Sequence, residues 1–205
     1  MGAADTMTRK TSVGGFELQF DPADIPALAR RYGPKRDDKA LAAGSRIRGG
    51  EYTREHLLEI FEWKTNGRGR SRLLLNCDNE IEDALRLAVR AKTERAAIAV
   101  LVGLHGVLVP VASAILTTIY PERYTVIDFR ALKALGSKSA DRTVNFYLAY
   151  LDTCRGLATT HGVALRDLDR ALWRWSDEQS ARLRPISRRR RPAMSLTQNR
   201  LYGNS

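Results

Sequence analysis

The stretch LVGLHGVLVPVASAILTTIYPERYTVIDFRALKALG, residues 101–136, decides the fold of this chain. Its apolar residues recur at helical spacing on both sides of Gly106, which predicts two helices joined by a tight turn. After Pro121, a third helix is expected to begin near Asp128 and to end at Gly136. Such a turn lets backbone N–H groups approach a phosphate, and the next helix N-terminus adds free donors. An ordinary helical hairpin has the same pattern, so both interpretations stay open.

Helical patterns continue on both sides of this stretch. Helices are predicted to begin at Pro22, Thr53, Asn79, Thr93 and Asp141, and a last one carries Leu165, Leu168, Leu172 and Trp175. Residues 33–50 are charged and glycine-rich, which favours a loop with at most a short helix near Ala40. FELQF (16–20) fits a short strand, or a segment that docks its two phenylalanines. With so little strand signal, we predict an all-α fold.

The chain length suits one helical domain over residues 16–184, built as two lobes that share a central cleft. Residues 1–15 have few apolar side chains and are predicted to be disordered, and residues 185–205 to form a basic disordered tail. The net charge of +11 suggests an anionic partner such as nucleic acid. Seven arginines and no acid lie from Arg182 onward, which leaves +4 for the rest. A solvated basic tail would therefore explain the charge almost as well.

The composition argues against several classes of protein. Two cysteines cannot supply the four thiolates of an iron–sulfur cluster, and the three histidines lack metal-ligand spacing, so we expect no metal and no cofactor. No apolar run approaches the roughly 20 residues of a membrane span. The polar N-terminus lacks the apolar core of a secretory signal. A cytoplasmic protein without a membrane partner is therefore expected.

Residues 101–136 resemble the helix-hairpin-helix DNA glycosylase superfamily, which includes the endonuclease III, adenine-mismatch and alkyladenine glycosylases. The run LHGVL (104–108) is similar to the family's hairpin L-P-G-[VI]-G, and Asp128 follows Gly106 by 22 residues, the family's spacing from hairpin glycine to catalytic aspartate. EWKTNGRGRS (62–71) and RALWRWS (170–176) resemble short, uncharacterised bacterial members. The resemblance implies a helical fold with a central cleft. It also implies that the hairpin binds the DNA backbone through Leu104, His105, Gly106, Val107, Leu108 and Val109.

Three residues depart from the family pattern. His105 replaces the usual proline, and Leu108 replaces the second glycine, where a side chain narrows the choice of backbone conformation. Pro110 stands where members that also cleave the DNA strand carry an imine-forming lysine. Proline has no amine, so the resemblance implies a monofunctional enzyme, one without lyase activity. Lys64 or Lys133 would overturn this expectation by pointing into the cleft.

The resemblance makes Asp128 the catalytic carboxylate. Glycosidic cleavage gives the sugar oxocarbenium character, and a carboxylate near C1′ stabilises that charge and orients or deprotonates the attacking water. A role as helix N-cap is compatible with this one, because it would hold the carboxylate rigid. Arg130 is expected to bind phosphate or to pair with the acid. The candidates for the pocket of the flipped base, each with packing or solvation as the plainer alternative, are Trp63, Lys64, Tyr120 and Tyr124.

We therefore expect a monomeric, monofunctional DNA glycosylase that acts on a modified or damaged base in double-stranded DNA. Its setting would be base-excision repair or defence against phage. A non-enzymatic helix-hairpin-helix DNA-binding protein is the alternative, and it would need no acid at Asp128. A third possibility is a structural or regulatory protein with a decayed motif, which His105 and Leu108 favour.

Overall fold

The computed structural model describes residues 12–13, 15–33 and 36–183, which form helices almost throughout and confirm the all-α prediction. A short 3-10 turn, Pro22–Asp24, precedes the first α-helix. The helices are α1 Ile25–Tyr32, α2 Asp38–Arg48, α3 Arg54–Thr65, α4 Arg70–Leu73, α5 Asp78–Arg90, α6 Glu94–Val102, α7 Val109–Ile119, α8 Phe129–Ala134, α9 Val144–Thr160 and α10 Leu165–Arg182. The predicted tail, 185–205, lies outside the described residues, as does most of segment 1–15.

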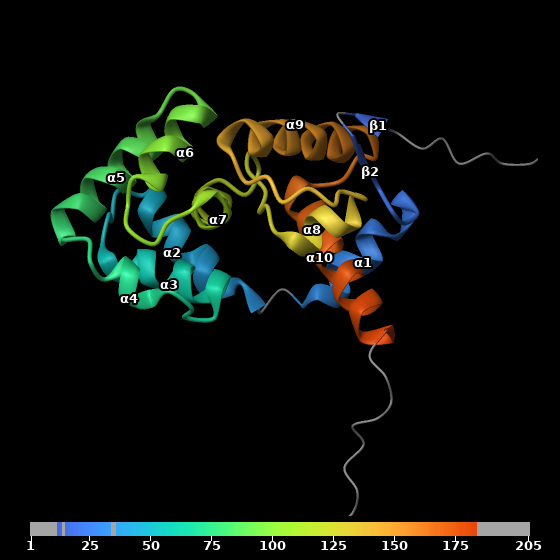
Figure 1. Cartoon of the computed structure of the whole chain (residues 1–205), viewed down its shortest axis with the longest axis horizontal. Coiled ribbons are helices and arrows are strands. Elements are labelled where there is room, and N and C mark those ends of the chain that lie inside the picture. The colour runs from blue at the N-terminus through green and yellow to red at the C-terminus, as the bar shows by residue number, and fades with distance from the viewer. Residues whose placement is uncertain (1–11, 14, 34–35, 184–205) are drawn as a thin grey trace, which may run out of the picture.

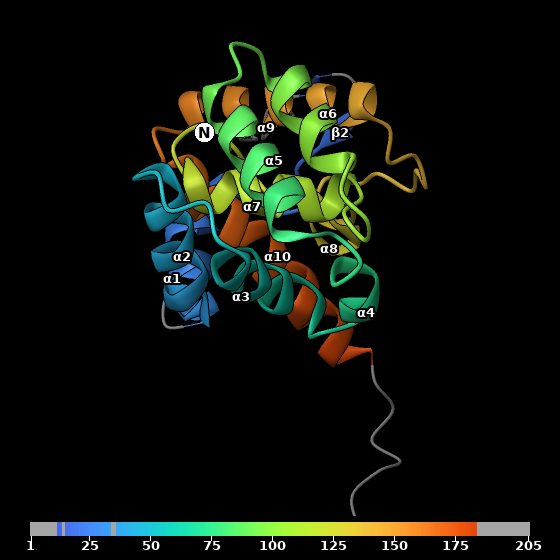
Figure 2. The ribbon, with the colours of Figure 1, turned by 90° about the vertical axis from the view of Figure 1, so that its left-hand side faces the viewer.

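Helix α7 forms the centre of the molecule. Figure 1 shows α2–α6 on one side of it and α1 with α8–α10 on the other, and Figure 2 also shows α7 near the middle. Every residue of α7 except Pro110 is buried. Its sequence has apolar or small residues all round, the pattern of a helix without a solvent face. The hydroxyl of Thr117 donates to the Ser113 carbonyl, so burial leaves that group bonded.

The prediction of a loop over residues 33–50, with at most a short helix near Ala40, underestimates the helix, because α2 covers Asp38–Arg48. Helix α2 packs against α7 through a small-residue face, on which Ala40, Ala43 and Gly44 are buried. A Cβ atom at Gly44 would lie 2.2 Å from the carbonyl oxygen of Thr118, so only glycine permits this close approach. Packing against α7 here outweighs the weak helix propensity of glycine.

Two predicted N-caps are each shifted by two residues, from Asn79 to Cys77 and from Asp141 to Thr143. Helix α5 begins just before Asn79, and the Glu80 carboxylate accepts a hydrogen bond from the Cys77 N–H at 2.6 Å. Helix α9 is capped by Thr143 and not by Asp141, whose carboxylate accepts from the Thr143 N–H instead. The predicted caps of α3 and α6 are confirmed: Thr53 and Thr93.

A small hairpin forms at the N-terminal end of the described residues. Strand β1, Ser12–Val13, pairs antiparallel with β2, Phe16–Glu17, and the other residues of 1–15, apart from Gly15, lie outside the described part of the chain. Gly15 between them has a φ of +80°, a conformation that favours glycine. The strand predicted within FELQF is thereby confirmed at its first two residues.

Residues 17–19, at the end of β2 and just after it, cap the C-terminal end of α8. The N–H groups of Glu17 and Gln19 donate to the carbonyls of Leu135 and Ala134, each at 2.9 Å. These bonds satisfy acceptors that a helix end leaves free. The Phe16 ring is buried beneath the same contact. The N-terminal segment thus fixes the helix whose other end carries Asp128.

Candidate functional site

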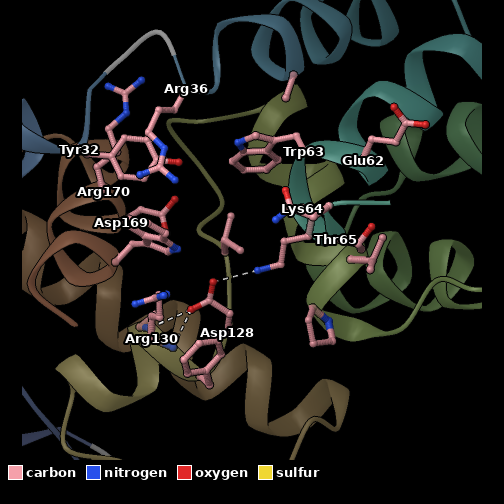
Figure 3. Close-up of a pocket in the computed structure, with 18 of the residues that line it drawn as sticks. Tyr32, Arg36, Glu62, Trp63, Lys64, Thr65, Asp128, Arg130, Asp169 and Arg170 are labelled. Atoms are coloured by element: carbon pink, nitrogen blue, oxygen red, sulfur yellow. Dashed lines mark hydrogen bonds and ion pairs between the residues drawn. The ribbon is translucent and has the colours of Figure 1, made fainter. Parts of the chain in front are cut away.

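A cleft of about 970 Å³ lies beside the N-termini of α7 and α8. One wall comes from the C-terminal half of α3, and the opposite wall from α10 and the end of α1 (Figure 3). The lining residues are Tyr32, Arg36, Lys39, Ala40, Glu59, Glu62, Trp63, Lys64, Thr65, Asn66, Arg68, Pro110, Val111, Val126, Asp128, Phe129, Arg130, Ala131, Arg166, Asp169, Arg170 and Trp173.

The cleft combines positive charge with aromatic surface. Seven lining residues are Lys or Arg and four are Asp or Glu, so the cleft favours an anionic ligand. Phe129 is 65% exposed and follows Asp128 directly. Trp63 and Trp173 contribute indole rings from facing walls. Such a surface suits a ligand that joins phosphate groups to flat rings.

Asp128 caps α8 and holds its carboxylate in the cleft. Its Oδ1 accepts from the N–H groups of Arg130 and Ala131 at 3.0 and 2.9 Å, and its Oδ2 lies 3.0 Å from Nζ of Lys64. Burial acts to raise the pKa of Asp128, but the Lys64 ammonium and the two backbone N–H groups outweigh it and lower the pKa. Asp128 is therefore an ionised carboxylate, rigidly held, at neutral pH.

The segment before Asp128 is fixed from two sides. The Ile127 N–H donates to Oγ of Ser113 on α7 at 3.1 Å. From α9, the Tyr150 hydroxyl donates to the Val126 carbonyl at 2.8 Å, and Tyr147 bonds the preceding residue in the same way. Both tyrosines are fully buried. A carboxylate on such a support keeps its geometry when a ligand binds.

Lys64 reaches into the cleft from the last turn of α3. Its side chain is 12% exposed and extends toward Asp128, while Asp169 and Arg170 lie on the opposite wall (Figure 3). The solvated helix-end position considered for Lys64 is therefore wrong. Lys133, the other lysine singled out, is exposed on α8 and does not line the cleft.

The hairpin between α6 and α7 depends on one glycine. Gly106 has a φ of +78°, and a Cβ atom there would lie 2.9 Å from the Leu73 nitrogen. Leu108 has a φ of −98°, an ordinary extended conformation, so the missing second glycine causes no backbone strain. The Leu108 side chain is 69% exposed and points away from the core.

The hairpin offers backbone donors together with the exposed side chains of His105 and Leu108. Leu104, Val107 and Val109 are buried in the core. Within the described part of the chain, no group accepts a hydrogen bond from the N–H of Gly106, Leu108 or Val109. The next two residues of α7 line the cleft. Three backbone N–H groups thus lie without an acceptor beside the cleft, at the positive end of the α7 dipole.

Arg130 lines the cleft but does not pair with Asp128 through its side chain. Its Nη1 lies 3.0 Å from Oδ1 of Asp177, and its guanidinium lies over the Trp173 ring at 4.7 Å. Arg36 lies over the same ring at 4.5 Å. Trp173 therefore lines the cleft between two guanidinium groups.

The structure does not bring Tyr120 and Tyr124 into the cleft. The turn that they bracket directs their rings toward Arg123, and the two rings lie 6.4 Å apart. Tyr124 is buried, and the Tyr120 hydroxyl donates to the Val89 carbonyl at 3.4 Å. Of the four predicted base-pocket residues, the cleft holds Trp63 and Lys64.

A buried ionic network in the α10 wall of the cleft was not predicted from the sequence. The Arg166 guanidinium binds the carboxylates of Asp37 and Asp169, and Arg170 binds Asp37 at 3.2 Å. Burial raises the pKa of Asp169, and Arg166 opposes that rise. The sequence did hold a signal, because Asp169 occupies the helical face of the apolar residues of α10: Leu165, Leu168 and Leu172.

A metal-ligand cluster, a membrane-spanning helix and a related known protein are three further features that could point to a function. Nowhere in residues 12–13, 15–33 and 36–183 do three His, Cys, Asp or Glu side chains gather as metal ligands would. Over the same ranges, no helix has the length and apolar character needed to cross a membrane. No family model, curated protein or solved structure matches the chain.

Proposed function

We propose that this chain is a DNA glycosylase of the helix-hairpin-helix type, which hydrolyses the N-glycosidic bond of a modified or damaged base flipped out of duplex DNA. The observation that carries the proposal is Asp128, an ionised and rigid carboxylate in a basic cleft. It would stabilise positive charge at C1′ as the bond to the base breaks. It would then take a proton from the water that adds to C1′.

Backbone donors and exposed arginines support duplex DNA as the partner. The N–H groups of Gly106, Leu108 and Val109 would bind one phosphate, independently of sequence. Arg68 and Arg72 are exposed, and the Cβ of Arg72 is close to Gly106. A cleft of about 970 Å³ is within the range of pockets that hold ligands of several rings, so it has room for a flipped nucleotide.

The carboxylate favours an enzyme over a protein that only binds DNA. An ionised Asp128 repels phosphate, so a pure binding protein would lose affinity by keeping it in the cleft. A glycosylase needs that charge in the transition state. The non-enzymatic alternative remains as an outcome of the test below.

The target base is proposed to be modified or damaged, in a setting of repair or phage defence. Removal of ordinary bases would destroy the host genome, and weakened pairs flip more easily. Trp63 is proposed as the stacking surface for the base, because one guanidinium, that of Arg166, lies over its ring at 5.6 Å, whereas two lie over Trp173. The protein is proposed to act as a monomer.

The proposal is tested with a panel of duplexes that each carry one modified base, followed by alkaline cleavage at abasic sites. The wild type should release at least one base, and Asp128→Asn should lower the single-turnover rate by about 10²–10⁴-fold. Asparagine can still cap α8, so the fold should persist. Asp141→Asn, at an exposed aspartate outside the cleft, is the matched control. Duplex binding without release of any base would favour the binding protein, and a near-wild-type rate for Asp128→Asn would refute the catalytic role.

A further inference from the structure

We infer that Lys64 gives this cleft a second activity, as an amine nucleophile that attacks the abasic sugar and leads to cleavage of the DNA strand. The inference rests on the proposed function, because base release creates the aldehyde that an amine attacks. It replaces the expectation of a purely hydrolytic enzyme, which depended on Pro110 alone.

The position of Lys64 relative to Asp128 is the main evidence. Their Nζ and Oδ2 atoms are 3.0 Å apart, and the two side chains are 12% and 19% exposed. A carboxylate that stabilises charge at C1′ must lie next to C1′. An amine in contact with the same carboxylate is therefore within reach of that carbon after a small rotation.

No other described lysine combines these features. Lys39 lines the cleft, but its side chain is exposed. Lys133 is exposed and lies outside the cleft lining. The hairpin position itself holds Pro110, which has no amine.

Lys64 attacks as the neutral amine, after its ammonium has lost a proton to the solvent, and Asp128 stays ionised in this step. The amine nitrogen bonds to C1′ of the ring-opened sugar, and a proton moves from nitrogen to the former aldehyde oxygen to give a carbinolamine. The hydroxyl takes a proton from the solvent and leaves as water, which gives a protonated imine. The carboxylate then takes a proton from C2′, and the bond from C3′ to oxygen breaks as the phosphate leaves with the electron pair. Water finally hydrolyses the imine and frees Lys64.

The experiment starts from a duplex that already contains an abasic site, made by removing uracil, so the base that the enzyme prefers does not matter. Borohydride reduces an imine to a stable amine, and the wild type should become covalently linked to the DNA. Peptide mapping should place the adduct within 55–68, because trypsin does not cleave after a modified lysine. Lys64→Arg keeps a cation beside Asp128, yet its adduct should fall to the level of a protein-free control. Lys133→Arg should be trapped as well as the wild type.

The outcomes separate this inference from the proposed function. An adduct on Lys39 or another residue, or no adduct with folded wild type, would overturn the role of Lys64. Base release on the modified panel without trapping would leave the glycosylase standing and remove the lyase. Trapping on Lys64 without release of any base would support the amine and refute the glycosylase. Mapping uses the wild type, so the answer does not depend on whether Lys64→Arg folds.

Discussion

Asn76 holds both backbone groups of His105. Its Oδ1 accepts from the His105 N–H at 2.8 Å, and its Nδ2 donates to the His105 carbonyl at 3.0 Å. The same Nδ2 donates to the Leu73 carbonyl at 2.7 Å, and Asn76 is 3% exposed. The hairpin is thus fixed by a residue that precedes His105 by 29 positions.

Asn76→Ala should loosen the hairpin and destabilise the fold. The substitution leaves partly buried polar groups without partners, which lowers the free energy of unfolding by about 1–3 kcal/mol. Duplex affinity should fall with it, because the phosphate donors lie in the same turn. Chemical denaturation and a binding titration measure the two effects. Asn79→Ala, at an exposed neighbour on α5, is the control, and equal stability of the two variants would contradict the role of Asn76.

Gly106→Ala should destabilise the protein more than Gly162→Ala. Both glycines have a positive φ, +78° and +62°, so each alanine meets a conformational penalty of about 1–2 kcal/mol. Only the Cβ at Gly106 meets a backbone atom, the Leu73 nitrogen at 2.9 Å, whereas the one at Gly162 has no atom within 4 Å. Thermal unfolding of the pair isolates the clash. Equal losses would show that the contact with Leu73 relaxes freely.

Lys64→Met should shift the acidic limb of the pH–rate profile for base release to higher pH. Activity requires the carboxylate, so it is lost as pH falls through the pKa of Asp128, which Lys64 holds below its ordinary value. Without the ammonium, burial still acts to raise that pKa, and protonation then begins at a higher pH. Single-turnover rates from about pH 3 to 7, a range that includes the ordinary aspartate pKa of about 3.9, give the limb. Lys64→Arg retains the charge, so its limb should lie near that of the wild type, and an unmoved limb in Lys64→Met would show that Lys64 does not tune Asp128.

Local sequence signals predicted most of the helices, but they could not predict which residues far apart in the sequence lie close together in the fold. Thr53 and Thr93 cap their helices because each needs only the next three residues. The contact of Lys64 with Asp128 spans 64 positions and depends on how α3 packs against α7. A lysine near a helix end looks like an ordinary solvated residue until that packing is known. The length of helix α2 was underestimated for the same reason, since its small residues favour a helix only when they pack against α7.

Asp37→Asn should destabilise the fold strongly. Asp37 is fully buried and binds Arg166 and Arg170, so the substitution leaves buried guanidinium charge without its carboxylate. Breaking a buried ion pair from one side costs about 3–5 kcal/mol. Denaturant unfolding measures the loss. Asp38→Asn, at the exposed neighbouring residue, should hardly change the free energy of unfolding. If Asp37→Asn lost less stability than Asp38→Asn, Asp169 alone would be sufficient to neutralise Arg166.

Deletion of residues 185–205 should weaken duplex binding and reduce its salt dependence. The segment lies outside the described residues, but it carries five arginines and no acid. For every phosphate that the shortened chain no longer binds, the slope of log affinity against log salt should fall by roughly 0.9, because fewer counterions are released. Replacement of the arginines at 188–191 by glutamine keeps the length and should give most of the same change. The choice among modified bases should stay the same, since the cleft is lined by residues 32–173. Titrations at several salt concentrations measure the slope, and an unchanged value in both variants would assign these arginines to a role other than DNA binding.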